Sequence, residues 1–174
     1  MALRQILTEP NRILREKSLP VEIVDDDLRK LMDDMLETMY AAPGIGLAAI
    51  QIGVPKQVIV LDIDQKEGKK NPLFFINPEI VKKSQTNSIY EEGCLSVPGQ
   101  FAEIERPESC QIKYLDYNGE KKEIEAKGML ATCIQHEMDH LEGVLFIDYL
   151  SNLKKSIIIK KLSKQKKSLE RIVV

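Results

Sequence analysis

The chain has 174 residues, of which 43% are apolar and 30% are charged, and its net charge is −2. This length suits one ordinary domain with its own core, and the composition excludes a disordered or fibrous chain. The balanced charge gives no overall attraction to DNA or to a membrane surface. We therefore expect a single domain spanning residues 1–174.

The sequence also predicts the compartment. The first ten residues, "MALRQILTEP", lack the basic and apolar regions of a signal peptide, and no apolar run approaches the roughly 18 residues of a membrane span. The three cysteines are Cys94, Cys110 and Cys133, an odd number that argues against a disulfide framework. We expect a cytoplasmic protein with reduced thiols and no membrane partner.

Hydrophobic spacing predicts the elements in chain order. Residues 25–40 have apolar side chains at helical spacing and acidic residues at the start, and "APG" follows to end the helix. Residues 57–64 and 72–81 have the pattern of strands. Residues 111–126 resemble a hairpin, with a type I′ turn at Asn118-Gly119. Strands in the middle and helices near both ends predict an α+β fold with antiparallel sheets.

The stretch "QHEMDHLEG" contains both histidines of the chain, His136 and His140, with Glu137 between them. It lies in a segment with the apolar spacing of a mostly buried helix. Residues four apart share one face of a helix, so both imidazoles can bind one metal ion. Such an ion lowers the pKa of its bound water to about 7, and Glu137 is placed to transfer a proton. A buried helix with two hydrogen-bonded histidines is the alternative interpretation.

The motif leaves the third ligand open. Some metalloproteases place a third histidine where this chain has Phe146, which cannot bind a metal. Cys94, after a flexible glycine in "YEEGCLSVPG", is a suitable thiolate ligand and would leave a fourth position open for water. Cys133 is also possible, because it precedes His136 by three residues on the same helix. Each cysteine could instead be a small buried apolar residue.

A glycine-rich stretch, "GIGLAAIQIG" at 44–53, matches the loose dinucleotide fingerprint. That interpretation fails because the fingerprint needs a strand before it and a helix after it, whereas here a helix precedes and Gly53 and Pro55 follow. The stretch is either a glycine turn leading into a buried strand, or a place where a ligand approaches the backbone closely. In the second case Gln51 can donate a hydrogen bond to a ligand carbonyl.

The last predicted helix, at about 151–174, is basic, with seven lysines between Lys154 and Lys167. The simpler interpretation is a packed terminal helix with a solvated basic face. The alternative is electrostatic docking on ribosomal RNA.

Together, "GIGLAAIQIG", "EEGCLS" and "QHEMDHLEG" resemble the peptide deformylase family, in that family's order and spacing. The resemblance extends over nearly the whole chain, and "GCLS" is similar to the bacterial type. It implies a hydrolase of protein biosynthesis that removes the N-formyl group from formyl-methionyl nascent polypeptides and releases formate. It also implies antiparallel sheets packed around a central helix that carries the HExxH motif, in a single catalytic metallohydrolase domain.

The same resemblance implies the site residues. The metal ligands would be Cys94, His136 and His140, the ion Fe(II), one per chain, with Zn, Ni or Co able to substitute. Glu137 would be the acid and base, and Gln51 with the backbone N–H of Leu95 would stabilise the oxyanion. The formylated peptide would contact Ile45, Gly46 and Gly93. An ion pair between Glu92 and Arg106 would support the site.

Two other functions fit parts of the sequence. A zinc metalloprotease would use the same HExxH motif on internal peptide bonds. A structural Cys-His-His metal fold with a binding role would give Glu137 no purpose and would need a fourth protein ligand.

Overall fold

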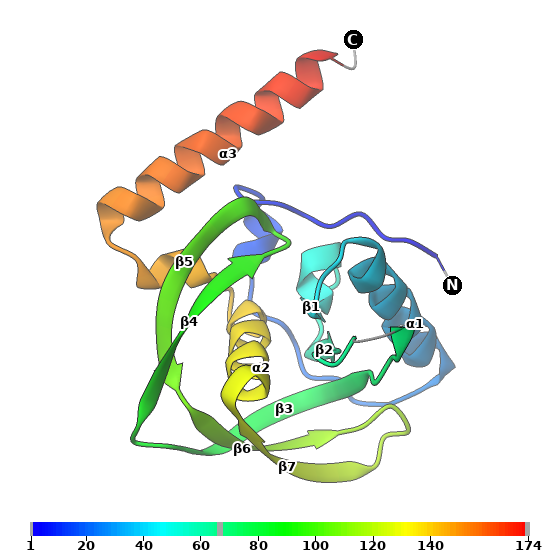
Figure 1. Cartoon of the computed structure of the whole chain (residues 1–174). Coiled ribbons are helices and arrows are strands. Elements are labelled where there is room, and N and C mark those ends of the chain that lie inside the picture. The colour runs from blue at the N-terminus through cyan, green and yellow to red at the C-terminus, as the bar shows by residue number, and fades with distance from the viewer. Residues whose placement is uncertain (1, 66–67, 173–174) are drawn as a thin grey trace.

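The computed structural model describes the backbone of residues 2–65 and 68–172, and side chains as far as residue 168. In this part of the chain, three α-helices and seven strands make a mixed α/β fold with antiparallel sheets (Figure 1). The helices are α1 (Asp26–Ala41), α2 (Gly128–Leu141) and α3 (Asn152–Ile172). No described helix is long and apolar enough to cross a membrane.

Helix α1 forms where the spacing predicts it. The Asp25 side chain caps it by accepting a hydrogen bond from the Leu28 N–H at 2.8 Å, and Asp26 and Asp27 place negative charge in its first turn. Its buried side carries Met32, Met35 and Met39, among other residues. This face packs on the first two strands of the larger sheet.

The larger sheet has five strands in the order β1-β2-β3-β6-β7, all paired antiparallel. The strands are β1 (Gly46–Ala48), β2 (Val58–Leu61), β3 (Leu73–Lys83), β6 (Ser109–Leu115) and β7 (Lys121–Lys127). The strand predicted at 57–64 is therefore shorter than expected. Asp62 directly follows the strand and is buried. Hydrogen bonds from the Tyr40 hydroxyl and the Asn71 N–H satisfy its carboxylate there.

The predicted hairpin at 111–126 is formed by β6 and β7, but the predicted turn is wrong. A type I′ turn needs positive φ at both central residues, and Asn118 is not in that region while Gly119 has φ 82°. The Gly119 N–H donates to the Asp116 carbonyl at 2.9 Å, so Tyr117 and Asn118 are the central residues. The Asp116 carboxylate accepts from the Asn118 and Glu120 N–H groups and so stabilises this longer loop.

The second sheet is a hairpin of β4 (Asn87–Cys94) and β5 (Val97–Pro107). Helix α2 lies between this hairpin and the larger sheet (Figure 1), and it contacts strands of both. Nine of its residues are buried, a number that includes both histidines and Glu137. The side chains that form the site come from α2, the β4–β5 hairpin, and the glycine-rich segment that contains β1.

Candidate metal centre and active site

Helix α2 places the two histidines of the chain side by side. His136 and His140 lie one turn apart, their ring centroids are separated by 5.1 Å, and both rings are buried. The other side of the helix packs its own apolar side chains, such as Ile134 and Leu141, into a buried cluster, so the ring positions follow from the packing of the whole helix.

Strand β4 ends at Cys94 and brings its thiol to the two imidazoles. One donor atom from each of Cys94, His136 and His140 lies within 4.8 Å of the other two, and the Cys94 Sγ is 3.3 Å from His140 Nε2. Sulfur and nitrogen ligands of one tetrahedral ion lie about 3.5 Å apart, as follows from their usual bond lengths. The three donors therefore fit a single divalent ion, and they offer no fourth protein ligand among the described residues.

The other two cysteines lie outside this group. Cys110 is buried in β6, and Cys133 is buried on α2. Of the three cysteines, only Cys94 has its sulfur within reach of both imidazoles in the described part of the chain. Burial raises the pKa of the Cys133 thiol to about 12. Both cysteines fit the interpretation as small apolar residues.

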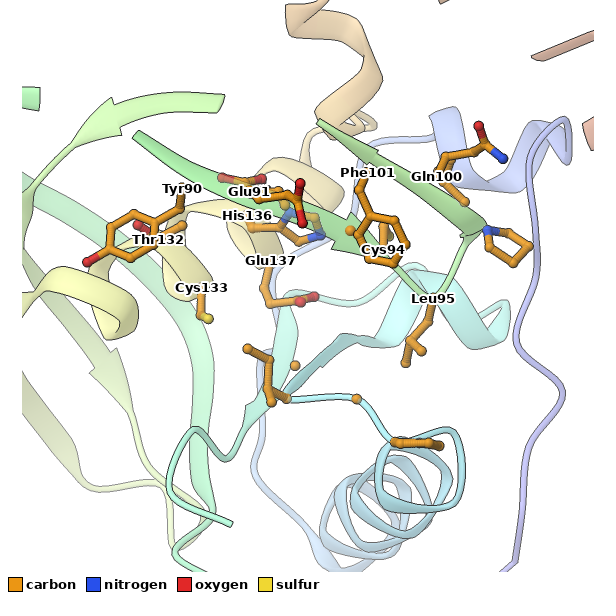
Figure 2. A pocket seen from close by; sticks show the side chains of 18 of the residues that line it. Tyr90, Glu91, Cys94, Leu95, Gln100, Phe101, Thr132, Cys133, His136 and Glu137 are labelled. Carbon is orange, nitrogen blue, oxygen red and sulfur yellow. Dashed lines mark hydrogen bonds and ion pairs between the residues drawn. The ribbon is translucent and has the colours of Figure 1, made fainter. Parts of the chain in front are cut away.

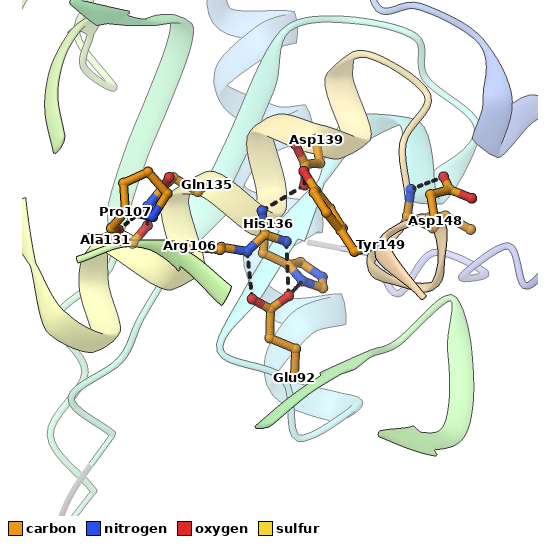
Figure 3. A network of polar contacts seen from close by, with 10 residues as sticks. Glu92, Arg106, Pro107, Ala131, Gln135, His136, Asp139, Asp148 and Tyr149 are labelled. Carbon is orange, nitrogen blue, oxygen red and sulfur yellow. Dashed lines mark hydrogen bonds and ion pairs between the residues drawn. The ribbon is translucent and has the colours of Figure 1, made fainter. Parts of the chain in front are cut away.

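A buried ion pair orients His136 (Figure 3). The His136 Nδ1 lies 2.8 Å from the Glu92 carboxylate, which also accepts two hydrogen bonds from Arg106 at 2.6 and 3.0 Å. Burial raises the pKa of Glu92, but the hydrogen bonds from His136 and Arg106 outweigh it, so the net pKa is lowered. The charged carboxylate holds the proton on Nδ1 and leaves Nε2 free as a ligand. The predicted pair of Glu92 and Arg106 is therefore confirmed.

The electrostatic surroundings of the two rings suit a bound cation. Burial, and then the neighbouring His136, hold the pKa of His140 well below its usual value, so this ring is neutral and offers a lone pair. For His136, burial lowers the pKa, but the hydrogen bonds with Cys94 and Glu92 raise it above its usual value overall. These acceptors stabilise positive charge on the ring, which a proton or a metal ion can supply.

Glu137 is buried beside the three donors. Burial raises the pKa of its carboxyl group to about 7, and among the described residues its Oε2 has no hydrogen-bond partner. An unpaired buried carboxylate is unfavourable, and such groups concentrate at functional sites. Its other oxygen lies against Gly46, where an added Cβ would overlap the carboxylate. Gly46 therefore gives Glu137 the space that it occupies.

Gln51 is fixed among apolar neighbours in the short helical turn η2 (Ala49–Ile52) that follows β1. Its Oε1 accepts a hydrogen bond from the Ala48 N–H at 2.8 Å, which settles the orientation of the amide. Its Nε2 therefore points at the thiol of Cys94, at 3.5 Å, and at the hydroxyl of Ser96, at 3.1 Å. The amide donor thus lies directly beside the ligand group.

These residues surround a pocket of about 480 Å³. Figure 2 shows Glu137 pointing from α2 into the pocket, with Cys94 and Leu95 at the end of the hairpin. Eight of the nine residues proposed from the sequence line it, and the ninth, His140, lies behind them in contact with Cys94. The eight are Ile45, Gly46, Gln51, Gly93, Cys94, Leu95, His136 and Glu137.

Comparison with known proteins identifies the family. Residues 3–156 match the model of the family described as polypeptide deformylase. The chain belongs to the polypeptide deformylase family. It is 68% identical to the peptide deformylase of Pelagibacter ubique (strain HTCC1062) over 174 residues, which cover 100% of both chains. It is 60% identical to the peptide deformylase of Phenylobacterium zucineum (strain HLK1) over 168 residues, or 97% of this chain and 99% of that one.

Solved structures of the family have the same fold. The crystal structure of peptide deformylase from Ehrlichia chaffeensis superimposes with a TM-score of 0.91 at 44% identity, covering 96% of this chain and 98% of the other. A structure from the same organism in complex with actinonin gives a TM-score of 0.90 at 47% identity, covering 95% and 98%. The predicted deformylase family and the predicted combination of helices with antiparallel sheets are confirmed.

Sequence reasoning missed two sets of supporting residues. Ser96 is buried and accepts the hydrogen bond that fixes the Gln51 amide, and its place in "GCLS" was the available signal. Asp139 accepts hydrogen bonds from both Arg106 and the Tyr149 hydroxyl, each at 2.8 Å (Figure 3). No spacing in the sequence links residues 106, 139 and 149, because they meet only in the folded chain.

Proposed function

We propose that this chain hydrolyses the N-formyl amide of formyl-methionyl nascent polypeptides and releases formate. The observation that carries this proposal is the convergence of Cys94, His136 and His140 beside the buried Glu137 in a pocket, within a chain of the deformylase family. In this proposal residues 1–174 act as one catalytic domain, with α2 as its central element.

Cys94, His136 and His140 are the proposed ligands of one divalent ion per chain. We assign Fe(II), the ion that the family resemblance implies, with Zn, Ni or Co able to substitute. One thiolate and two imidazoles suit first-row divalent ions in general. When bound, the ion supplies Lewis-acid polarisation of the formyl carbonyl and lowers the pKa of a bound water.

The chain's own residues handle the proton and the developing charge. Glu137, whose carboxyl pKa is raised to about 7 by burial, takes the proton from the attacking water and returns it to the leaving amine. The Gln51 Nε2–H and the Leu95 backbone N–H donate to the oxyanion that forms on the formyl oxygen. Each donor aimed at such an oxyanion typically contributes about 3–4 kcal/mol to the transition state.

The peptide would lie extended along the pocket. In the described part of the chain β4 pairs only with β5, so its other edge is open where Gly93 lines the pocket. Ile45 and Gly46 line the facing wall, and their backbone groups can bind the peptide in the manner of an added strand. Gly46 also has no room for a side chain beside Glu137.

Formate release from formyl-Met-Ala-Ser by protein loaded anaerobically with Fe(II) tests the proposal. We expect Glu137→Ala to keep its metal while turnover falls by about 10²–10⁴-fold, the usual contribution of a general acid and base. Full turnover by the metal-loaded variant would contradict the mechanism. Cleavage of internal peptide bonds, without formate release, would instead identify a metalloprotease.

We also propose cytoplasmic ribosomes as a partner of α3. Its first half packs on the body through Ile158, Ile159 and Leu162, and Figure 1 shows the helix extending away from the body beyond them. The lysines beyond Leu162, such as Lys164, Lys166 and Lys167, are exposed and can contact RNA phosphates. Co-sedimentation with ribosomes should weaken steeply from 50 to 200 mM salt, and neutralising these three lysines to Gln should abolish it. Co-sedimentation that is insensitive to salt, or no co-sedimentation at all, would contradict this proposal.

A further inference from the structure

One large aromatic side chain at the pocket has no role in the proposed chemistry. Phe101 of β5 lines the pocket, yet its side chain is 65% exposed. Its ring covers Gly93: a Cβ added there would lie only 2.7 Å from the ring atom Cδ1 of Phe101. An exposed ring of this size that borders a substrate pocket is a candidate contact for the substrate.

The hairpin is built to bring this ring to the pocket. Cys94 pairs with Val97, whereas Gly93 pairs with Phe101, so residues 98–100 form an irregular bulge in β5. Gly99 in this bulge has φ 69°, a conformation that favours glycine. Bulges beside active sites redirect a side chain, and here the redirected side chain is that of Phe101.

The alternation of side chains along a strand determines which part of a peptide meets Phe101. Glu92 and its partner Ala102 face one side of the hairpin, where Glu92 is buried, so Gly93 and Phe101 face the opposite, outer side. A peptide extended beside Gly93 alternates in the same way. If its methionine points inward to Met129 and Cys133 of α2, the next side chain points outward.

At that outer position Gly93 offers no side chain of its own. Neighbouring strands lie about 4.8 Å apart, so the side chain after methionine lies within reach of the ring that covers Gly93. Figure 2 shows Phe101 at the hairpin end, away from Tyr90 and Thr132 at the other end of the pocket. The exposed ring thus borders the pocket at its hairpin end, beside Gly93.

We propose that Phe101 is a specificity-determining residue that contacts the side chain following formylmethionine and favours apolar and aromatic residues there. This proposal rests on the proposed function, because it assigns a further part of the same substrate. Gly93 permits the contact, since any side chain at this position would displace the ring.

The test compares kcat/KM for formyl-Met-Phe-Ser and formyl-Met-Ser-Ser. Exposed aromatic pairs predict that the wild-type protein prefers the first peptide by about two- to tenfold. In Phe101→Ala this ratio should fall to about one, through loss on the Phe peptide alone, while Phe101→Tyr should keep it. The matched control is Ile89→Ala: Ile89 is 63% exposed on the same outer face of β4 but does not line the pocket, so the ratio should not change.

Two results would overturn the proposal. A ratio that survives in Phe101→Ala means that the ring does not contact this residue. An equal loss on both peptides means that the ring acts only by supporting the hairpin. If the wild-type protein releases no formate from either peptide, the proposed function itself fails, and this assignment fails with it.

Discussion

Helix α2 is held by two sheets through different kinds of contact. Against the five-stranded sheet it packs apolar side chains, including Ile134 and Leu141, into a cluster with residues such as Phe75. Against the β4–β5 hairpin its contacts are polar: His136 meets Glu92, and His140 meets Cys94. The same helix thus has one side fixed by burial and another fixed by directed hydrogen bonds.

The two kinds of contact respond differently to substitution. Apolar burial is not directional, so exchanges that conserve volume cost little and leave the helix in place. Hydrogen bonds to buried charged groups depend on single atoms, and their loss leaves a partner unsatisfied. The large sheet therefore determines where the helix lies, and the hairpin determines how its histidines are aimed. We expect substitutions in the two regions to separate stability from metal binding.

The largest difference, in metal content, is expected between substitutions of Cys94 in the hairpin and of Cys133 in the apolar cluster of α2. Cys94→Ala removes the only hairpin donor of the ligand group in the described chain, and we expect the purified protein to lose its metal and its turnover. Cys133→Ala removes a buried thiol from the apolar cluster, and we expect full metal content with a loss of about 1 kcal/mol in unfolding free energy. Metal analysis and chemical denaturation of both variants measure this difference.

Each variant is the control for the other, because both remove a thiol from a cysteine near the histidines. Retention of a full metal complement in Cys94→Ala would show that the ligand set is wrong. Loss of metal from Cys133→Ala would bring back the alternative ligand on the helix.

A smaller difference, in metal affinity, is expected for Glu92, which contacts the proposed ligand His136. Glu92→Gln removes the charge that orients His136, and losing such a supporting carboxylate typically weakens metal affinity by about 10–100-fold. Ile134→Val removes one buried methylene from the opposite side of α2, which costs about 0.5–1.5 kcal/mol of stability and should leave affinity unchanged. Titration against a competing chelator gives both affinities. Equal affinities in the two variants would mean that the hairpin does not aim the ring.

The sequence predicted the apolar region more completely than the polar one. Helical spacing around residues 25–40 and the strand pattern at 72–81 reflect local burial, and both elements formed there. The His136–His140 pair was readable because it depends on helical spacing alone. The contacts of Arg106 with Glu92 and Asp139 join three separate elements, and only the resemblance to a family pointed to the first of them.

Local geometry set a second limit on prediction. The pair Asn118-Gly119 favours a two-residue turn, but the Asp116 side chain accepts hydrogen bonds from two backbone N–H groups and stabilises a different loop. The bulge that brings Phe101 opposite Gly93 was also unpredicted, because a register shift has no fixed sequence signature.

The smallest difference in metal affinity is expected at Tyr149, the surface end of the series of hydrogen bonds that leads to His136. The Tyr149 hydroxyl donates to Asp139, which accepts from Arg106, which in turn holds Glu92. Tyr149→Phe keeps the ring beside the guanidinium, 5.0 Å away, and removes only the hydroxyl. One lost hydrogen bond should lower the unfolding free energy by about 0.5–1.5 kcal/mol and, transmitted in part, weaken metal affinity by about two- to threefold.

Tyr117→Phe is the matched control for this substitution. The Tyr117 hydroxyl also donates to a carboxylate, that of Asp33 on α1. Tyr117 packs on the apolar cluster of α1, β1 and β2, which contains no residue of α2 in the described part of the chain. We expect a similar or smaller loss of stability and no change in metal affinity, because this hydrogen bond has no connection to His136. Equal metal affinities in the two variants would mean that Arg106 is already held firmly by Glu92. The directed contacts that matter for the metal would then end inside the protein rather than at its surface.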